Sequence, residues 1–137
     1  METGMNGELL ECVSHNLLPA NAYSPLVLAY LGDAVYELYV RTHLCQKNAP
    51  VHQLHKEATA YVKAEAQSRM MDVLEPMLTE EEQAVYKRGR NAKSATVPKN
   101  ANVLDYRRAT GLEALLGYLY VSHQTERLET LIRRVLL

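Results

Sequence analysis

The stretch LAYLGDAVYELYV, from Leu28 to Val40, limits the possible folds more than any other part of this sequence. Its hydrophobic residues recur at helical spacing, but they surround almost the whole helix instead of lining one face. We expect a core-facing stripe formed by Leu28, Leu31, Val35 and Leu38. The opposite side is also mostly apolar, so it must be covered by the rest of the protein or by a second copy of the chain.

That opposite side is where a second copy would bind. Its residues are mostly apolar, which is unexpected for a helix surface that faces water. Asp33 would lie at the margin of the contact between the two copies. The sequence therefore predicts a homodimer through this helix. The predicted interface residues are Leu26, Ala29, Tyr30 and Val40.

The rest of the chain also has a helical pattern, and no alternating strand pattern competes with it. Ser24 and Pro25 form an N-cap followed by proline at the first helical position, while Thr79 and Glu82 form a capping box. The predicted helices cover about 25–46, 51–75, 80–89, 103–123 and 125–137, with a break near Gly111. We expect one all-α domain over 1–137, with a lead-in over 1–22 and a basic loop over 92–102.

Two carboxylates lie in apolar surroundings at opposite ends of the sequence. Asp33 lies in LAYLGDAVYE, and Glu113 lies in ATGLEALLGYLY, where Gly117 and other small residues let a second backbone approach. If the two helices cross at Ala29 and Gly117, the carboxylates converge and need a positive charge between them. Oxygen ligands suit Mg²⁺ or Mn²⁺. The alternative for each acid taken alone is a surface or ion-paired carboxylate.

Charge is unevenly distributed along the chain, although the net charge is only -1. The segment 87–108 contains one acid, Asp105, and many basic residues. The basic residues are Lys87, Arg88, Arg90, Lys93, Lys99, Arg107 and Arg108. By composition alone, this segment is either a solvated face or a phosphate-binding surface.

The two carboxylate elements and the basic segment together resemble a known family. LAYLGDAVYE, EALLGYLY and VYKRGRNAKSATVPKN are similar to the catalytic domain of ribonuclease III, and most similar to its compact subgroup, Mini-ribonuclease III. The likeness extends over about 24–120. This subgroup consists of the catalytic domain alone, with no double-stranded RNA-binding domain.

The resemblance implies the helical fold of the ribonuclease III catalytic domain, working as a homodimeric, Mg²⁺-dependent endoribonuclease in which Mn²⁺ can substitute. Its implied substrate is double-stranded RNA, in particular the precursor of large-subunit (23S) ribosomal RNA. Asp33 and Glu113 match the metal-binding acids, which makes them the expected catalytic and metal-ligating residues. The basic segment is the expected RNA-binding surface.

Three family acids are missing from this sequence. Full-length members have acids where this chain has Leu26, Ala29 and Thr110. The alternative is therefore a catalytically silent module of the same fold that binds RNA during ribosome assembly. The sequence leaves open whether a ribosomal protein assists this function.

The sequence has neither a long apolar run nor a basic leader, so we expect a cytoplasmic protein with no membrane contact.

Overall fold

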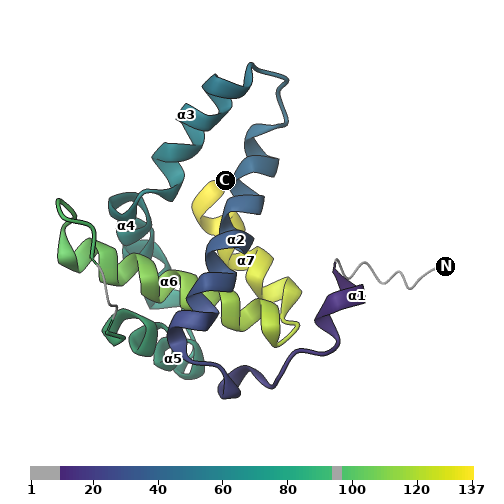
Figure 1. Cartoon of the computed structure of the whole chain (residues 1–137), viewed down its shortest axis with the longest axis vertical. Helices are drawn as coiled ribbons and strands as arrows, with labels where there is room; N and C mark the ends of the chain where they lie inside the picture. Colours follow the sequence, from purple (N-terminus) through teal and green to yellow (C-terminus); the bar gives the residue numbers. More distant parts are fainter. Residues whose placement is uncertain (1–9, 94–96) are drawn as a thin grey trace.

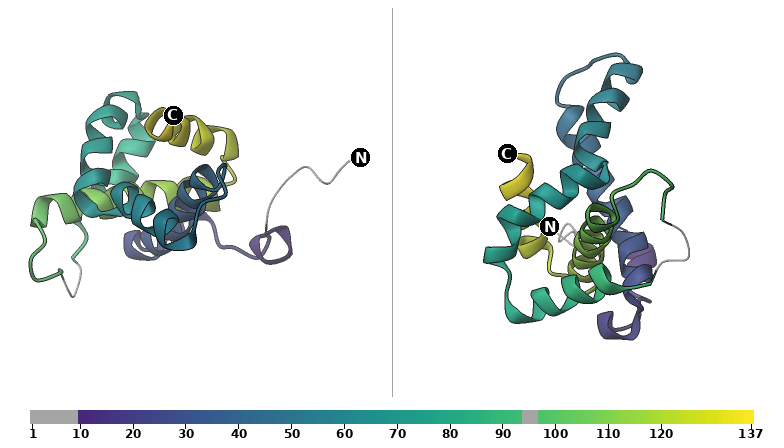
Figure 2. Two further views of the ribbon diagram at one scale, coloured as in Figure 1. Left: turned by 90° about the horizontal axis from the view of Figure 1, so that it is seen from above. Right: turned by 90° about the vertical axis from the view of Figure 1, so that its left-hand side faces the viewer.

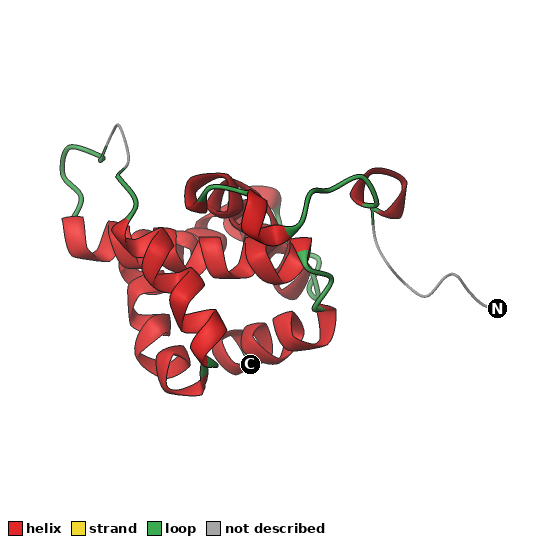
Figure 3. Cartoon of the chain, turned by 90° about the horizontal axis from the view of Figure 1, so that it is seen from below, coloured by secondary structure: helices red, strands yellow, loops and turns green. Residues whose placement is uncertain are grey.

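The fold is given by a computed structural model, which describes residues 10–93 and 97–137 (Figure 1). All regular structure within these residues is helical, so the predicted all-α class is confirmed (Figure 3). The elements are α1 (Glu11–Ser14), η1 (Ala20–Ala22), α2 (Pro25–Leu44), α3 (Val51–Val62), α4 (Ala64–Leu74), η2 (Glu75–Met77), α5 (Glu80–Asn91), α6 (Val103–Val121) and α7 (Thr125–Leu136).

The crossing of α2 and α6 is the centre of the fold (Figure 1). A methyl group added at Gly32 would overlap the carbonyl oxygen of Glu113, and one added at Gly117 would overlap the carbonyl oxygen of Leu28. The two backbones therefore touch, which only glycine at both positions allows. The predicted crossing point at Gly117 is confirmed, but the opposing residue is Gly32 rather than Ala29.

The remaining helices pack around this crossing. α4, α5 and α7 all contact α6, and the amphipathic α7 buries Leu128, Leu131 and Ile132 against the core. α3 contains no buried residue. It extends from the body beside the C-terminal half of α2 (Figure 2).

The predicted N-caps are present. The Ser24 Oγ accepts a hydrogen bond from the Val27 N–H at 3.2 Å. The Thr79 Oγ1 accepts from the Glu82 N–H, and the Glu82 carboxylate accepts from the Thr79 N–H. Burial alone would raise the pKa of Glu82, but hydrogen bonds from Arg127 and Thr79 hold that pKa below its usual value. The Glu82–Arg127 pair thereby joins the start of α5 to α7.

The helix predicted over 51–75 is two helices. The chain turns at Lys63, whose φ of -67° and ψ of 152° are those of extended backbone. The break predicted near Gly111 is absent, and α6 continues through that residue. A side chain at Gly111 would collide with the ring of Tyr86, so this glycine allows close packing between α5 and α6.

The buried face of α2 differs from the predicted one. Ala29 and Val40 are 6% and 0% exposed, whereas Leu38, placed in the predicted core stripe, is 56% exposed. The close approach at Gly32 turns the line of Ala29, Tyr36 and Val40 toward α6 and the core. Ala29 and Val40 are therefore wrong as interface residues, because each is already buried within its own chain.

Candidate functional site

The α2–α6 crossing brings together the two carboxylates singled out in the sequence. Asp33 follows the contact glycine of α2 directly, and Glu113 contributes the α6 carbonyl that Gly32 touches. The two carboxyl groups lie close enough for each to shift the pKa of the other. Asp33 is exposed at the rim, while Glu113 is half-buried.

Both carboxyl groups hold protons more tightly than an ordinary carboxylate does. Burial, followed by the charge of Asp33, raises the pKa of Glu113 to about 8. Burial also raises the pKa of Asp33, as does the negative charge of Glu37. Two acids that repel each other in a partly dry site are stabilised by a positive charge between them. The pair therefore fits a hard divalent cation.

The chain offers few other ligands for such a cation. Among the described residues, no group of three or more His, Cys, Asp or Glu side chains could hold a metal ion. Glu37 lies one turn after Asp33, but its carboxylate accepts a hydrogen bond from Arg41 at 3.1 Å. Waters and a substrate phosphate would have to complete an octahedral shell around the cation.

Gln67 is a residue of this site that the sequence interpretation missed. It lies on α4, is 2% exposed, and donates from Nε2 to the Glu113 Oε2 at 3.4 Å. The sequence does contain an indication of this burial: Gln67 precedes Met71 and Leu74 at helical spacing, so a polar side chain occupies a core position.

The basic segment forms a pocket next to the carboxylate pair. This pocket has a volume of about 300 Å³ and lies between the end of α5 and the start of α6. It is lined by Gly89, Arg90, Ala92, Lys93, Val97, Tyr106, Arg107 and Thr110. Thr110 lies one helical turn before Glu113 on α6, so the pocket begins beside the site.

The seven predicted RNA-binding residues are not equivalent. Lys87, Arg88, Lys93, Lys99 and Arg107 are exposed. Arg90 packs over the Tyr86 ring, with 5.7 Å from its guanidinium carbon to the ring centroid. Arg108 is engaged within the chain, where it donates to Asp72 at 2.8 Å and to Ser68 at 3.0 Å. Arg108 therefore joins α6 to α4.

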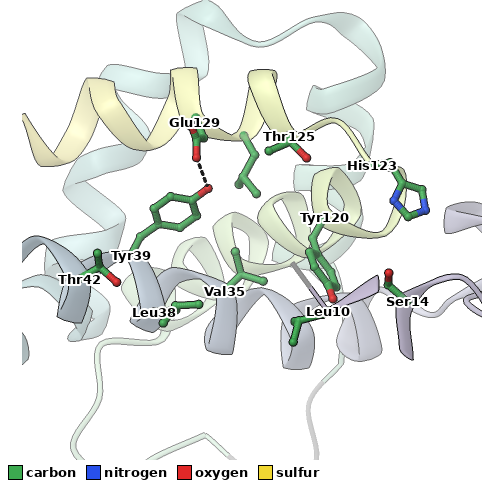
Figure 4. Close-up of a pocket in the computed structure, with 11 residues that line it drawn as sticks. Leu10, Ser14, Val35, Leu38, Tyr39, Thr42, Tyr120, His123, Thr125 and Glu129 are labelled. Carbon is green, nitrogen blue, oxygen red and sulfur yellow. Dashed lines mark hydrogen bonds between the residues drawn. The ribbon is translucent and has the colours of Figure 1, made fainter. Parts of the chain in front are cut away.

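A second pocket, of 310 Å³, lies between α2 and α7 (Figure 4). It is mostly apolar, and Val35 and Leu38 contribute to its wall. The Tyr39 hydroxyl donates to the Glu129 Oε2 at 3.1 Å across one end of the pocket. Of the predicted interface residues, Tyr30 is 80% exposed and Leu26 is 38% exposed on the same helix.

Comparisons with known proteins agree on one family. Residues 26–124 match the sequence profile of the ribonuclease III domain. Mini-ribonuclease 3 of Thermoanaerobacter sp. (strain X514) is 54% identical over 110 residues, which cover 80% of this chain and 78% of that protein. Mini-ribonuclease 3 of Streptococcus pneumoniae is 46% identical over 119 residues, which cover 85% and 93% of the two proteins.

The fold also matches a solved structure. An X-ray crystal structure of a Fusobacterium nucleatum protein superposes with a TM-score of 0.75 at 36% sequence identity. The match covers 81% of this chain and 89% of that one. Within the described part of the chain, no helix is both long enough and apolar enough to cross a bilayer.

Proposed function

This chain belongs to the ribonuclease III family, and we propose that it matures the precursor of large-subunit (23S) ribosomal RNA in the cytoplasm. It is an endoribonuclease that acts on double-stranded RNA with a divalent metal ion, as its family does. The observation that carries the proposal is the convergence of Asp33 and Glu113 at the α2–α6 crossing. The ribosomal precursor is inferred from the resemblance to the compact subgroup, and the chain is taken to be one catalytic domain.

We propose that Asp33 and Glu113 are the catalytic metal ligands and that Mg²⁺ is the natural ion, with Mn²⁺ able to replace it. When bound, the ion supplies a Lewis acid for in-line hydrolysis of a phosphodiester. The chain's own part is to fix the two carboxylates. The backbone contact at Gly32 and Gly117 sets their separation, and exposure of Asp33 leaves one side open to RNA.

We propose that the basic pocket between α5 and α6 binds the RNA. Arg90, Lys93 and Arg107 line it, and none of them forms an ion pair with a carboxylate of the described residues. Phosphate groups of an RNA duplex bind to such cations without regard to sequence. A duplex held there would pass next to Glu113, because Thr110 belongs to the pocket wall and lies one turn away.

Metal removal tests the activity and the substrate together. The purified protein should cut a labelled duplex from the ribosomal RNA precursor at a defined position in Mg²⁺, and it should not cut it after EDTA treatment. An unrelated duplex of equal length is the matched control, and ribosomal proteins can be added to the precursor to test for assistance. Equal cutting of both duplexes, with and without ribosomal proteins, would contradict the precursor assignment. Binding without cleavage in Mg²⁺ would favour the catalytically silent alternative.

We propose that the enzyme is a homodimer through the outward face of α2. Leu26, Tyr30 and Leu38 lie along this face and are 38%, 80% and 56% exposed. Their spacing makes one apolar stripe. Leu38, at one end of this stripe, also lines the pocket between α2 and α7 (Figure 4). A two-fold contact between copies of one helix covers such a stripe on both chains at once.

Tyr30→Asp should convert the dimer to a monomer. The dissociation constant should rise roughly a thousandfold, since an anchor tyrosine contributes about 2 kcal/mol and two-fold symmetry counts it twice. Sedimentation equilibrium at micromolar concentration measures the change. Val51→Asp is the matched control, because Val51 is 81% exposed but lies on α3. A parent protein that is already monomeric would contradict this interface.

A further inference from the structure

The buried amide of Gln67 has an incomplete set of hydrogen bonds. Its Nε2 donates to the carbonyl oxygen of Val62 at 2.9 Å and to the Glu113 Oε2 at 3.4 Å. Its Oε1 is buried and has no hydrogen-bond partner among the described residues. Leaving a buried amide oxygen unpaired costs about 1–3 kcal/mol. An apolar residue of the same length would fill the space without that cost.

The orientation of this amide is determined by Val62. If the amide were flipped, Oε1 would face the Val62 carbonyl oxygen, and two acceptors would meet at hydrogen-bond distance. Nε2 must therefore lie on the side of Val62 and Glu113. Oε1 and Nε2 share one amide carbon, so the unpaired oxygen belongs to the same amide group that contacts the Glu113 carboxylate.

The break between α3 and α4 makes the Val62 carbonyl available. In a continuous helix this carbonyl would accept from the N–H four residues later, which belongs to Ala66. Here the N–H groups of Ala66 and Gln67 both donate to the carbonyl of Lys63 instead. The Val62 carbonyl is thus left to hold the Gln67 side chain, so the turn at Lys63 has a direct consequence for the site.

We propose that Gln67 is a positioning residue for the metal site. Its Nε2 holds the Glu113 carboxylate in one orientation, and its Oε1 accepts a hydrogen bond from water around the bound cation. The inference rests on the proposed role of Glu113 as a metal ligand. It goes beyond that role because it assigns to α4 a side chain that orients the ligand and contacts its water.

Gln67→Met tests this assignment with Mn²⁺ as the probe. Methionine keeps the length of the side chain and removes both polar atoms. The Mn²⁺ dissociation constant of the RNA-free protein, measured by electron paramagnetic resonance, should rise about 10- to 100-fold. The thermal unfolding midpoint in EDTA should change little, because removing the unpaired Oε1 offsets the loss of the hydrogen bond to the Val62 carbonyl. The Mg²⁺ concentration for half-maximal cleavage should rise, with an unchanged KM for RNA at saturating Mg²⁺.

Two further variants separate the possible outcomes. Ser68→Ala is the matched control: Ser68 is also 2% exposed on α4, but it bonds Arg108 and not Glu113, so it should lower stability without changing Mn²⁺ affinity. Glu113→Gln should lose Mn²⁺ binding.

If Glu113→Gln loses Mn²⁺ binding but Gln67→Met binds Mn²⁺ like the parent, the Gln67 inference is overturned and the proposed metal site survives. If Glu113→Gln binds normally, the proposed site itself fails. Unfolding of both Gln67→Met and Gln67→Leu in EDTA would make Gln67 a structural residue and overturn the inference.

Discussion

Asp33→Asn is expected to reduce cleavage of duplex RNA by several orders of magnitude while the protein remains folded. Asparagine keeps the shape of the side chain but removes the negative charge that would hold a divalent cation. The rate should be measured in single-turnover cleavage of a labelled duplex at saturating Mg²⁺. RNA binding at low salt should persist, because the basic pocket lies outside the carboxylate pair.

Glu113→Gln should cause a loss of similar size. The double variant should be little worse than either single one, because each change disables the same shared metal site. In EDTA, both single variants should be at least as stable as the parent. Neutralising one of two adjacent carboxylates removes their mutual repulsion, which chemical denaturation can measure.

Glu37→Gln is the matched control for charge at this site. Glu37 lies on the same helix one turn after Asp33, but its carboxylate is paired with Arg41. Its loss should change the cleavage rate far less than Asp33→Asn does. If Asp33→Asn cleaves duplex RNA at the parental rate, Asp33 is a structural carboxylate and not a ligand.

Much of the fold could be predicted because its local determinants are strong. Helical periodicity and the caps at Ser24 and Thr79 act within a few residues, so the starts of α2 and α5 follow from the sequence. The convergence of Asp33 with Glu113 depends on two distant segments. Small residues beside Glu113 indicated a close helix contact that could bring Glu113 to Asp33, and the family resemblance then supported that pairing.

The buried face of α2 could not be predicted in the same way. A helix that is apolar all round has almost no preferred direction, so a helical wheel does not determine which side faces the core. The contact of Gly32 with α6 decides the orientation instead. This contact buries Ala29 and Val40 and exposes Leu38, the reverse of the expectation for each of the three.

The turn at Lys63 and the role of Gln67 were missed for a related reason. The residues around Lys63 include neither glycine nor proline, and nothing local ends the helix there. Tertiary packing makes the turn, and the freed Val62 carbonyl then holds Gln67 beside Glu113. A single polar residue at a core position was the available indication, the same kind of evidence that singled out Asp33.

The second large effect is expected in RNA binding. Replacing Arg88, Lys93 and Arg107 together with glutamine should weaken duplex binding on the order of a hundredfold at moderate salt. Each phosphate contact that is lost should also lower the slope of log affinity against log salt by up to about one unit. Fluorescence anisotropy across a salt series measures both quantities. All three side chains are exposed, so the fold should tolerate the change.

Two controls distinguish the basic segment from charge in general. Changing Arg69, Arg133 and Arg134 to glutamine removes the same charge from exposed positions on α4 and α7, and it should leave the salt slope nearly unchanged. Arg108→Gln should behave differently again, lowering stability with little effect on the slope, because its guanidinium already binds Asp72 and Ser68. If the first triple variant keeps the parental slope, the segment is a solvated face and RNA must be held elsewhere.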